Sequence, residues 1–312
     1  MKYFCLRDDD TSFFTDCRVL KQCYGEIWDC IPITLATIPF IHGSSKKMEE
    51  FDPIYSRTST REPISAKDKK EQYRKLYEWE RTADEQSLTE YHTIHPIGEN
   101  IDLVAELREM VSRGTIEIAQ HGVYHRFTCD GAEMISSRIT RNNVLDGHAY
   151  LEKVFNTKIE TFIPPSNTID EECAHYVHDL GMHLFCSGEI QYVSKRKKIA
   201  SLIKHPDSLI FNIKRKLLRR KLPFSYSTGI VVFGSITYDP FKNKQQIINR
   251  IDSQLNETGF VSLGTHYSLL EKMEEYRRDY FEVVERFRMQ KDIIFVTATE
   301  YYRQIMEKYM NG

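Results

Sequence analysis

The sequence predicts an α/β protein whose strands and helices alternate to form a distorted barrel of about seven parallel strands. Short segments rich in apolar and β-branched residues alternate with segments of helical periodicity along most of the 312 residues. Repeated strand-then-helix units imply parallel strands joined by right-handed crossovers. In such a barrel, functional side chains lie at the C-terminal ends of the strands.

The predicted elements follow this alternation in chain order. Strands are predicted for residues 2–6, 32–40, 115–119, 159–163, 183–186, 230–236, 260–263 and 293–296. Helices are predicted for residues 16–28, 100–113, 142–155, 168–180, 241–255 and 269–290, followed by a last helix that begins at Thr297. Asn100 is the expected N-cap of its helix, and Thr168 with Glu171 forms a predicted capping box.

Two segments interrupt the alternation within a single predicted domain, residues 1–312. Residues 42–96 form an insertion after the second strand and contain a charged helix at about 65–91. We interpret this insertion as a lid or rim element over the site, with a simple surface excursion as the alternative. Residues 195–221 are strongly basic, which predicts either a solvated face or loop or a surface for an anionic glycan or lipid phosphate.

Composition excludes several classes of function. The net charge of -2 gives no strong attraction to nucleic acid or to a membrane surface. No apolar stretch approaches the roughly 20 residues that cross a bilayer, so no transmembrane segment is expected. The chain starts with a strand rather than a secretory signal, and its odd number of cysteines lacks a C-x-x-C pair. These features predict reduced thiols and a cytoplasmic location.

Acidic and histidine side chains follow two of the predicted strands. Asp8, Asp9 and Asp10 end the first strand, and like charges this close repel unless a cation or a shared proton lies there. His121 and His125 follow a middle strand with a spacing of four residues. Two histidines, a carboxylate and an open position match the ligand set of catalytic zinc sites, and other divalent transition metals would also fit.

Four segments together resemble the polysaccharide deacetylase family, which has the NodB-type fold. They are Arg7–Asp10, His121–His125, Phe162–Pro165 and Gly264–His266, in the order of that family. The resemblance implies a NodB-like barrel of seven strands and a metal-dependent hydrolase that removes an acyl group, for example acetyl, from an amino sugar or related amide. It covers nearly the whole chain except the insertion and the basic segment.

The resemblance also implies roles for individual residues. It makes Asp9 the catalytic base, His266 the general acid, and Asp10, His121 and His125 the ligands of a divalent metal, with zinc as the first candidate. We favour this register because Arg7 and Asp8 then occupy the last positions of the strand; Asp8 as base and Asp9 as ligand are the alternative. In the favoured register Asp8 is interpreted as a surface carboxylate.

Further residues near these strand ends are candidates for substrate contact. Arg7, Pro165, Asn167 and Tyr267 are predicted to bind substrate, with Asn167 as a helix cap as the alternative. His175 and His178 fall on a predicted helix and are interpreted as residues that bind no metal.

The chain also departs from the deacetylase pattern. Gly122 stands where the family has Ser or Thr, and Ile163 stands where it has an arginine that orients the base; Arg7 is the hypothesised replacement. The two alternative functions are hydrolysis of another C–N bond, as in a cyclic ureide or formamide, and glycan binding without catalysis.

Overall fold

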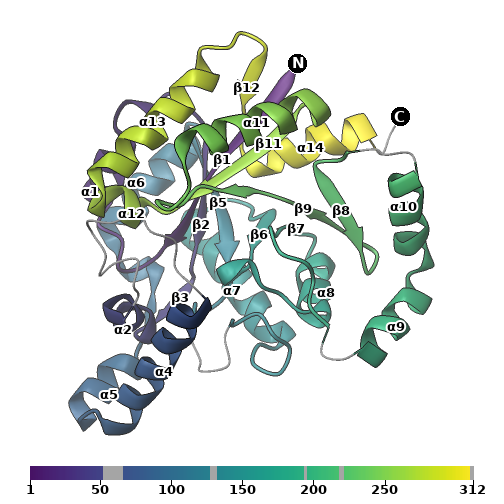
Figure 1. Cartoon of the computed structure of the whole chain (residues 1–312). Coiled ribbons are helices and arrows are strands. Elements are labelled where there is room, and N and C mark those ends of the chain that lie inside the picture. The colour runs from purple at the N-terminus through teal and green to yellow at the C-terminus, as the bar shows by residue number, and fades with distance from the viewer. Residues whose placement is uncertain (52–65, 127–131, 193–194, 218–220, 310–312) are drawn as a thin grey trace.

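The computed structural model describes residues 1–51, 66–126, 132–192, 195–217 and 221–309 of the chain. Its main element is a curled sheet with helices around the outside (Figure 1). The strand order is β10-β11-β1-β2-β5-β6-β7-β9-β8, and β12 pairs with β1 beside this path. Neighbouring strands run parallel throughout the described sheet, except in the β8–β9 hairpin.

The strands have the bounds β1 Lys2–Thr11, β2 Ile33–Thr37, β3 Phe40–His42, β4 Ile94–Pro96, β5 Ile116–His121, β6 Thr161–Ile163, β7 His183–Phe185, β8 Phe224–Ser227, β9 Ile230–Phe233, β10 Ile236–Thr237, β11 Phe260–Thr265 and β12 Ile293–Phe295. The predicted α/β class and the parallel sheet are therefore confirmed. The number of about seven strands is not, because the curled sheet has 10 strands within the described residues. Strand β8 lies outside every predicted strand, and the strand predicted for 230–236 is interrupted between β9 and β10.

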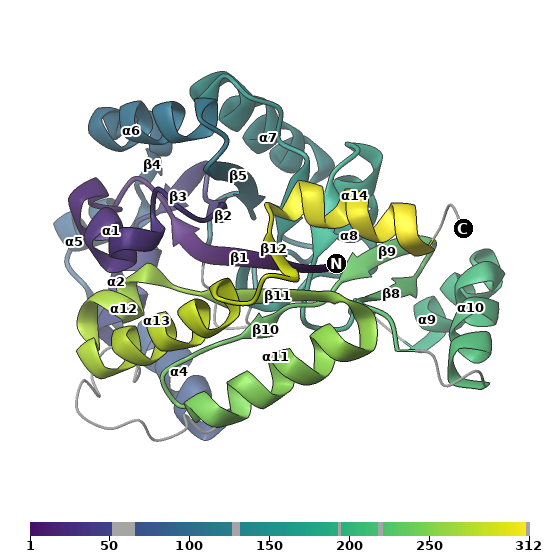
Figure 2. The ribbon, with the colours of Figure 1, turned by 90° about the horizontal axis from the view of Figure 1, so that it is seen from above.

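The helices have the bounds α1 Cys17–Tyr24, α2 Ser44–Phe51, α4 Ala66–Thr82, α5 Glu85–His92, α6 Ile101–Ser112, α7 Arg141–Phe155, α8 Glu171–Asp179, α9 Lys195–Lys204, α10 Pro206–Leu217, α11 Lys244–Thr258, α12 Tyr267–Lys272, α13 Glu274–Arg288 and α14 Ala298–Tyr309. Figure 2 shows α6 and α7 on one side of the sheet and α11 and α13 on the opposite side. Their apolar faces and the strands form one large core. No helix in the described part of the chain is long and apolar enough to span a membrane.

Three predicted helices differ from the structure in their N-cap or by a break. Helix α8 begins later than expected and is capped by Asp170, whose side chain accepts a hydrogen bond from the Cys173 amide, so the capping box of Thr168 and Glu171 is wrong. The helix predicted for 269–290 is broken at Met273 into α12 and α13. The charged helix of the insertion is likewise broken, since Asp84 caps a separate helix α5.

The insertion folds as α2, α4 and α5 between the strands of a small antiparallel pair, β3 and β4. Met48, Leu76 and Tyr91 form a separate apolar cluster inside it. Residues 52–65 of the insertion lie outside the described part of the chain. The insertion and the α9–α10 pair lie on opposite sides of the molecule (Figure 1).

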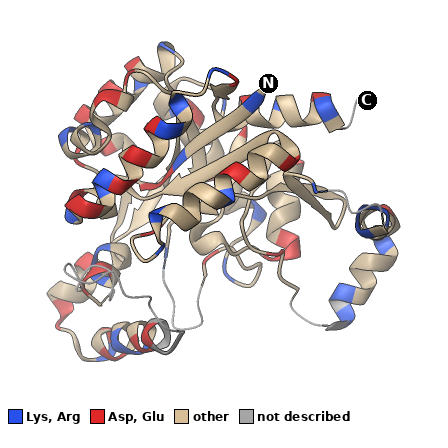
Figure 3. Ribbon diagram, turned by 45° about the horizontal axis from the view of Figure 1, so that its top comes forward, with Lys and Arg blue, Asp and Glu red and all other residues tan. Residues whose placement is uncertain are grey.

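Within the described part of the basic segment, residues 195–204 and 206–217 form the helix pair α9 and α10 rather than a loop, and residues 218–220 lie outside the described residues. Figure 3 shows its lysines and arginines at the edge of the molecule. Phe211 of α10 stacks on Phe224 of β8, and the Asn212 side chain donates a hydrogen bond to the Tyr226 carbonyl at 2.7 Å. These contacts attach α10 to the end of the curled sheet.

Candidate active site

The C-terminal ends of β1, β5 and β11 meet at an open pocket of about 540 Å³. It is lined by several residues that the sequence singled out, namely Asp9, Asp10, His121, His125, Asn167, His266 and Tyr267. Residues of the insertion, including Lys46, Glu49 and Tyr73, line the same pocket. The insertion therefore forms part of the pocket wall, as a rim element would.

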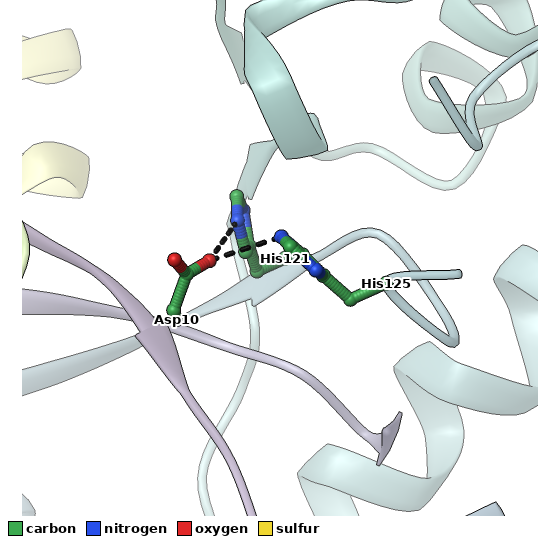
Figure 4. Close-up of side chains that lie close together, drawn as sticks. All are labelled: Asp10, His121 and His125. Atoms are coloured by element: carbon green, nitrogen blue, oxygen red, sulfur yellow. Dashed lines mark hydrogen bonds and ion pairs between the residues drawn. The ribbon is translucent and has the colours of Figure 1, made fainter. Parts of the chain in front are cut away.

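Asp10, His121 and His125 converge on one point of this pocket, and we call them the strand-end triad (Figure 4). The Asp10 Oδ1 atom lies 3.1 Å from His121 Nε2 and 3.0 Å from His125 Nε2. Burial alone would raise the pKa of Asp10, but His125 and His121 lower it well below its usual value, so the carboxylate is ionised. His266 Nε2 lies 3.6 Å from Asp10 Oδ2, beside the triad.

Hydrogen bonds orient the two triad histidines. His121 Nδ1 lies 2.8 Å from the Ile163 carbonyl oxygen, so Nδ1 carries a proton and donates it to that oxygen, while Nε2 is the ring nitrogen that faces Asp10. This is the arrangement by which proteins orient metal-binding histidines. The backbone of His125 is held by the Ser45 hydroxyl of α2, which donates to the His125 carbonyl at 2.8 Å.

Unusual backbone conformations cluster around the triad. Asp10 and His125 have φ angles of 76° and 48°, and Ser166 and Asn167 in the nearby turn have φ angles of 55° and 50°. The pairing of β1 with β2 shifts register between Asp8 and Thr11, so Asp10 sits in a local irregularity of the strand. Non-glycine residues in this region of conformational space are strained, and such strain concentrates at functional sites.

The three adjacent aspartates have three different environments. Asp8 is fully buried and accepts a hydrogen bond from the Tyr24 hydroxyl, and burial raises its pKa. Its interpretation as a surface carboxylate is therefore wrong. Asp9 forms an ion pair with Arg7 at 2.9 Å, and Asp10 belongs to the triad. The hypothesis that Arg7 supplies a charge beside Asp9 agrees with this ion pair.

Two predicted substrate contacts lie behind the pocket wall instead. Arg7 is 1 % exposed and contacts Asp9, so it is placed to orient that carboxylate. Pro165 is buried and packs against Gly122. Asn167 lines the pocket, and its side-chain oxygen accepts a hydrogen bond from the Ser187 amide rather than capping α8. Tyr267 lines the pocket while its hydroxyl donates to Thr15.

Gly122 is required by the packing between the triad histidines. Its φ angle is +61°, and a Cβ atom there would lie 2.3 Å from Glu133 Oε2 and 2.6 Å from Pro165 Cγ. A Ser or Thr at this position, as in the deacetylase pattern, would overlap both neighbours. The departure noted in the sequence thus has a structural cause.

Glu133 is a site residue that sequence reasoning missed. Its buried carboxylate accepts hydrogen bonds from the backbone amides of Val123 and Tyr124, at 3.1 and 2.7 Å. It therefore fixes the turn that carries His125. Glu133 lies outside every predicted helix and strand, so no periodic pattern marked it.

Comparison with known proteins overturns the resemblance to deacetylases. The sequence model for glycosyl hydrolase family 57 matches residues 46–311, a range that begins after the strand carrying the aspartates. No curated protein sequence matches the chain. The expected identity as a polysaccharide deacetylase, and with it deacylation or hydrolysis of another C–N bond, is therefore wrong. The short motifs that suggested it occur in the predicted order, but the family match extends over most of the chain.

Several solved structures resemble this chain at low sequence identity. A branching enzyme of the GH57 type from Pyrococcus horikoshii has 12% identity and a TM-score of 0.48, covering 97% of this chain and 70% of that one. A 4-alpha-glucanotransferase from Thermococcus litoralis has 13% identity and a TM-score of 0.46, covering 97% of this chain and 40% of that one. A putative polysaccharide deacetylase from Mycobacterium smegmatis has 10% identity and a TM-score of 0.48, covering 98% and 91%.

This chain thus spans about 40% of the length of the glucanotransferase. The match of the family model to residues 46–311 assigns the family: the chain belongs to glycosyl hydrolase family 57.

Proposed function

We propose that this chain hydrolyses glycosidic bonds of a glycan that binds in the pocket at the strand ends. The match to a glycosyl hydrolase family over residues 46–311 carries this proposal. The pocket supports it, because its volume and its mixture of aromatic and polar side chains suit a sugar ring. Phe14, Tyr73 and Tyr267 supply aromatic surface, and Asn167 and Ser166 supply polar groups.

Asp9 is the proposed general base. The guanidinium of Arg7 lies 2.9 Å from its carboxylate and orients it, and a carboxylate can accept a proton from the attacking water. The remaining oxygen of Asp9, Oδ1, is buried and has no hydrogen-bond partner within the described residues. Glycosidases commonly combine such a base with a separate acid.

His266 is the proposed general acid. It follows β11 and lines the pocket, and its Nε2 atom lies 3.6 Å from Asp10 Oδ2. An imidazolium at this position can protonate the glycosidic oxygen as the sugar leaves. Glu271 of α12 lines the same pocket and is the alternative acid.

The strand-end triad fits a divalent metal, with zinc as the first candidate and other transition metals as alternatives. The donor set of two imidazoles and a carboxylate, and the bond from His121 Nδ1 to a backbone carbonyl, are those of a metal site. A bound divalent ion supplies Lewis-acid stabilisation of developing negative charge and lowers the pKa of a bound water. Asp10, His121 and His125 would hold the ion.

Release of reducing ends tests the proposed reaction. The zinc-supplemented protein is incubated with α-glucans, other polysaccharides and defined oligosaccharides, and new reducing ends are counted. We expect cleavage by the wild type and a loss of about 10²–10⁴-fold in Asp9→Asn, the range for a general base or acid. Asp252→Asn is the matched control, because Asp252 pairs with Arg286 on the outer surface and should leave cleavage unchanged.

His266→Gln and Glu271→Gln separate the two candidate acids. If His266 is the acid, its variant loses activity on natural substrates but much less on substrates with an activated aryl leaving group, which needs no protonation. Glu271→Gln should then behave like the wild type. The proposal fails if the wild type cleaves no glycan, or if Asp9→Asn keeps full activity. The cytoplasmic location stays a prediction, testable by cell fractionation.

A further inference from the structure

A second group of metal-type side chains lies outside the pocket, and we call it the helix triad. Glu171 and His175 lie one turn apart on α8, and His205 lies at the junction between α9 and α10. One donor atom from each of these residues falls within 4.8 Å of the other two. Side chains four residues apart on a helix share one face, so α8 presents two donors toward His205.

The histidines of this group have unsatisfied nitrogens. Nε2 of His175 and Nε2 of His205 are both buried and have no hydrogen-bond partner within the described residues. The two rings stack with centroids 5.4 Å apart. Leaving a buried polar atom without a partner costs about 1–3 kcal/mol, and both of these unpartnered nitrogens belong to imidazoles of the helix triad.

Local packing fixes His205 at this position. Gly229, with a φ angle of +80°, approaches it so closely that a Cβ atom would lie 2.8 Å from His205 Nδ1. The Gly229 amide also donates to the Ser208 hydroxyl of α10 at 2.9 Å. The turn between β8 and β9 thus packs against the junction of α9 and α10.

We propose that Glu171, His175 and His205 bind a zinc ion that fastens the α9–α10 pair to α8. Two imidazoles and one carboxylate suit zinc, with water completing the coordination. The interpretation of His175 as a residue that binds no metal is thereby revised. This inference does not rest on the proposed function, since the helix triad shares no residue with the strand-end pocket.

The weak packing of α9–α10 explains what such an ion would contribute. Large apolar side chains of this pair remain exposed, among them Ile199 at 58 %, Ile203 at 75 % and Leu217 at 77 %. An element that buries little apolar surface gains little from the core, and a metal cross-link is a common substitute.

Zinc stoichiometry in a background without the strand-end triad tests the proposal. The His121→Asn protein is stripped with a chelator, dialysed against zinc and assayed by elemental analysis. We expect about one zinc ion per chain in the His121→Asn protein. We expect this ion to be absent from His121→Asn/His205→Asn and from His121→Asn/Glu171→Gln. His178→Asn is the matched control, because His178 is an exposed histidine on the same helix.

Trypsin supplies a second readout that needs no activity. The basic segment, residues 195–221, contains many cleavage sites. At free zinc about 100 times the dissociation constant, zinc should slow cleavage there by about 100-fold in the His121→Asn protein, because local opening must first release the ion. The protection should vanish in His121→Asn/His205→Asn. Unchanged stoichiometry in both double variants, or equal cleavage with and without zinc, would overturn the proposal.

Discussion

The strand-end triad and the helix triad present the same donors on different scaffolds. Both offer two histidines and one carboxylate. In the strand-end triad, His121 is oriented by a backbone carbonyl, and Asp10 and His125 have strained positive φ angles. In the helix triad, the carboxylate and one histidine sit on regular helix, and both histidines have an unsatisfied buried nitrogen.

We infer from this difference that the strand-end triad serves a reaction and that the helix triad serves attachment. Side chains preset by hydrogen bonds and by strained loops lose little freedom when they bind an ion. The strand-end triad also opens into a large pocket, whereas the helix triad joins elements that pack weakly. We therefore expect tight binding with an accessible position at the first site and weaker, structural binding at the second.

We expect the largest effects, on zinc binding and on glycan cleavage, when one histidine is removed from each triad in turn. We expect two classes of zinc binding in the wild type, with the strand-end class about 10–100-fold tighter because its ligands are oriented by outer hydrogen bonds. His121→Asn should eliminate the tight class together with glycan cleavage, and His205→Asn should eliminate only the weak class. Titration against a chromophoric chelator measures both. Loss of the weak class in His121→Asn would contradict the comparison.

A methyl group at Gly122 tests the strained scaffold of the strand-end triad. Gly122→Ala should lower the free energy of unfolding by about 2–4 kcal/mol. The cost of the positive φ angle and the cost of the overlap with Glu133 and Pro165 both contribute to this loss. Gly181→Ala is a matched control, since Gly181 has a φ angle of +76° but no atom within 4 Å of the added carbon. Its expected cost is about 1 kcal/mol. Urea unfolding measures both, and equal costs would show that the overlap is relieved.

The sequence predicts best those site residues that lie at the ends of predicted strands. Strand alternation places Asp10, His121 and His266 at one edge of the sheet, because the carboxyl ends of parallel strands meet there. Asp8 is buried beside the Tyr24 hydroxyl of α1, which donates a hydrogen bond to it, and no local sequence pattern predicts that contact. Such long-range hydrogen bonds are settled only by packing.

The short motifs could not identify the family, for a related reason. Short runs of aspartate and histidine indicate which residues can donate to a metal or to substrate, and similar donor residues serve different reactions on similar folds. Breaks such as the one at Met273, between α12 and α13, are also invisible in the helical periodicity of residues 269–290. The sequence therefore predicts the location of the site better than the reaction.

Replacing Glu133 tests the outer hydrogen bonds of the strand-end triad. Glu133→Gln keeps the shape of the side chain but replaces one of its two acceptor oxygens with an NH2 group. One of the bonds from the Val123 and Tyr124 amides is then lost, so the turn that carries His125 should loosen. We expect zinc binding in the tight class to weaken by about 10-fold and the weak class to stay unchanged. Glu172→Gln on α8, an exposed carboxylate that bonds Tyr176, is the control. A change in the weak class would show a general loss of stability instead.

The smallest expected effect concerns the stability contributed by His183, a histidine outside both triads. It shows how burial changes the pKa of a histidine. Burial lowers the pKa of His183, which stacks on Tyr302, to about 4. Its folded pKa lies below the unfolded value of about 6.5, so its contribution to stability is present above pH ~6.5 and is lost as the pH falls toward ~4. The stability cost of His183→Gln should therefore shrink by about 1 kcal/mol between pH 7 and pH 5, after allowance for partial exposure. Urea unfolding at both pH values measures the change, with the exposed His178→Gln as control. A cost that does not vary with pH would mean that His183 contributes through its stacking on Tyr302 alone, with its imidazole protonated to the same extent in the folded and unfolded chain.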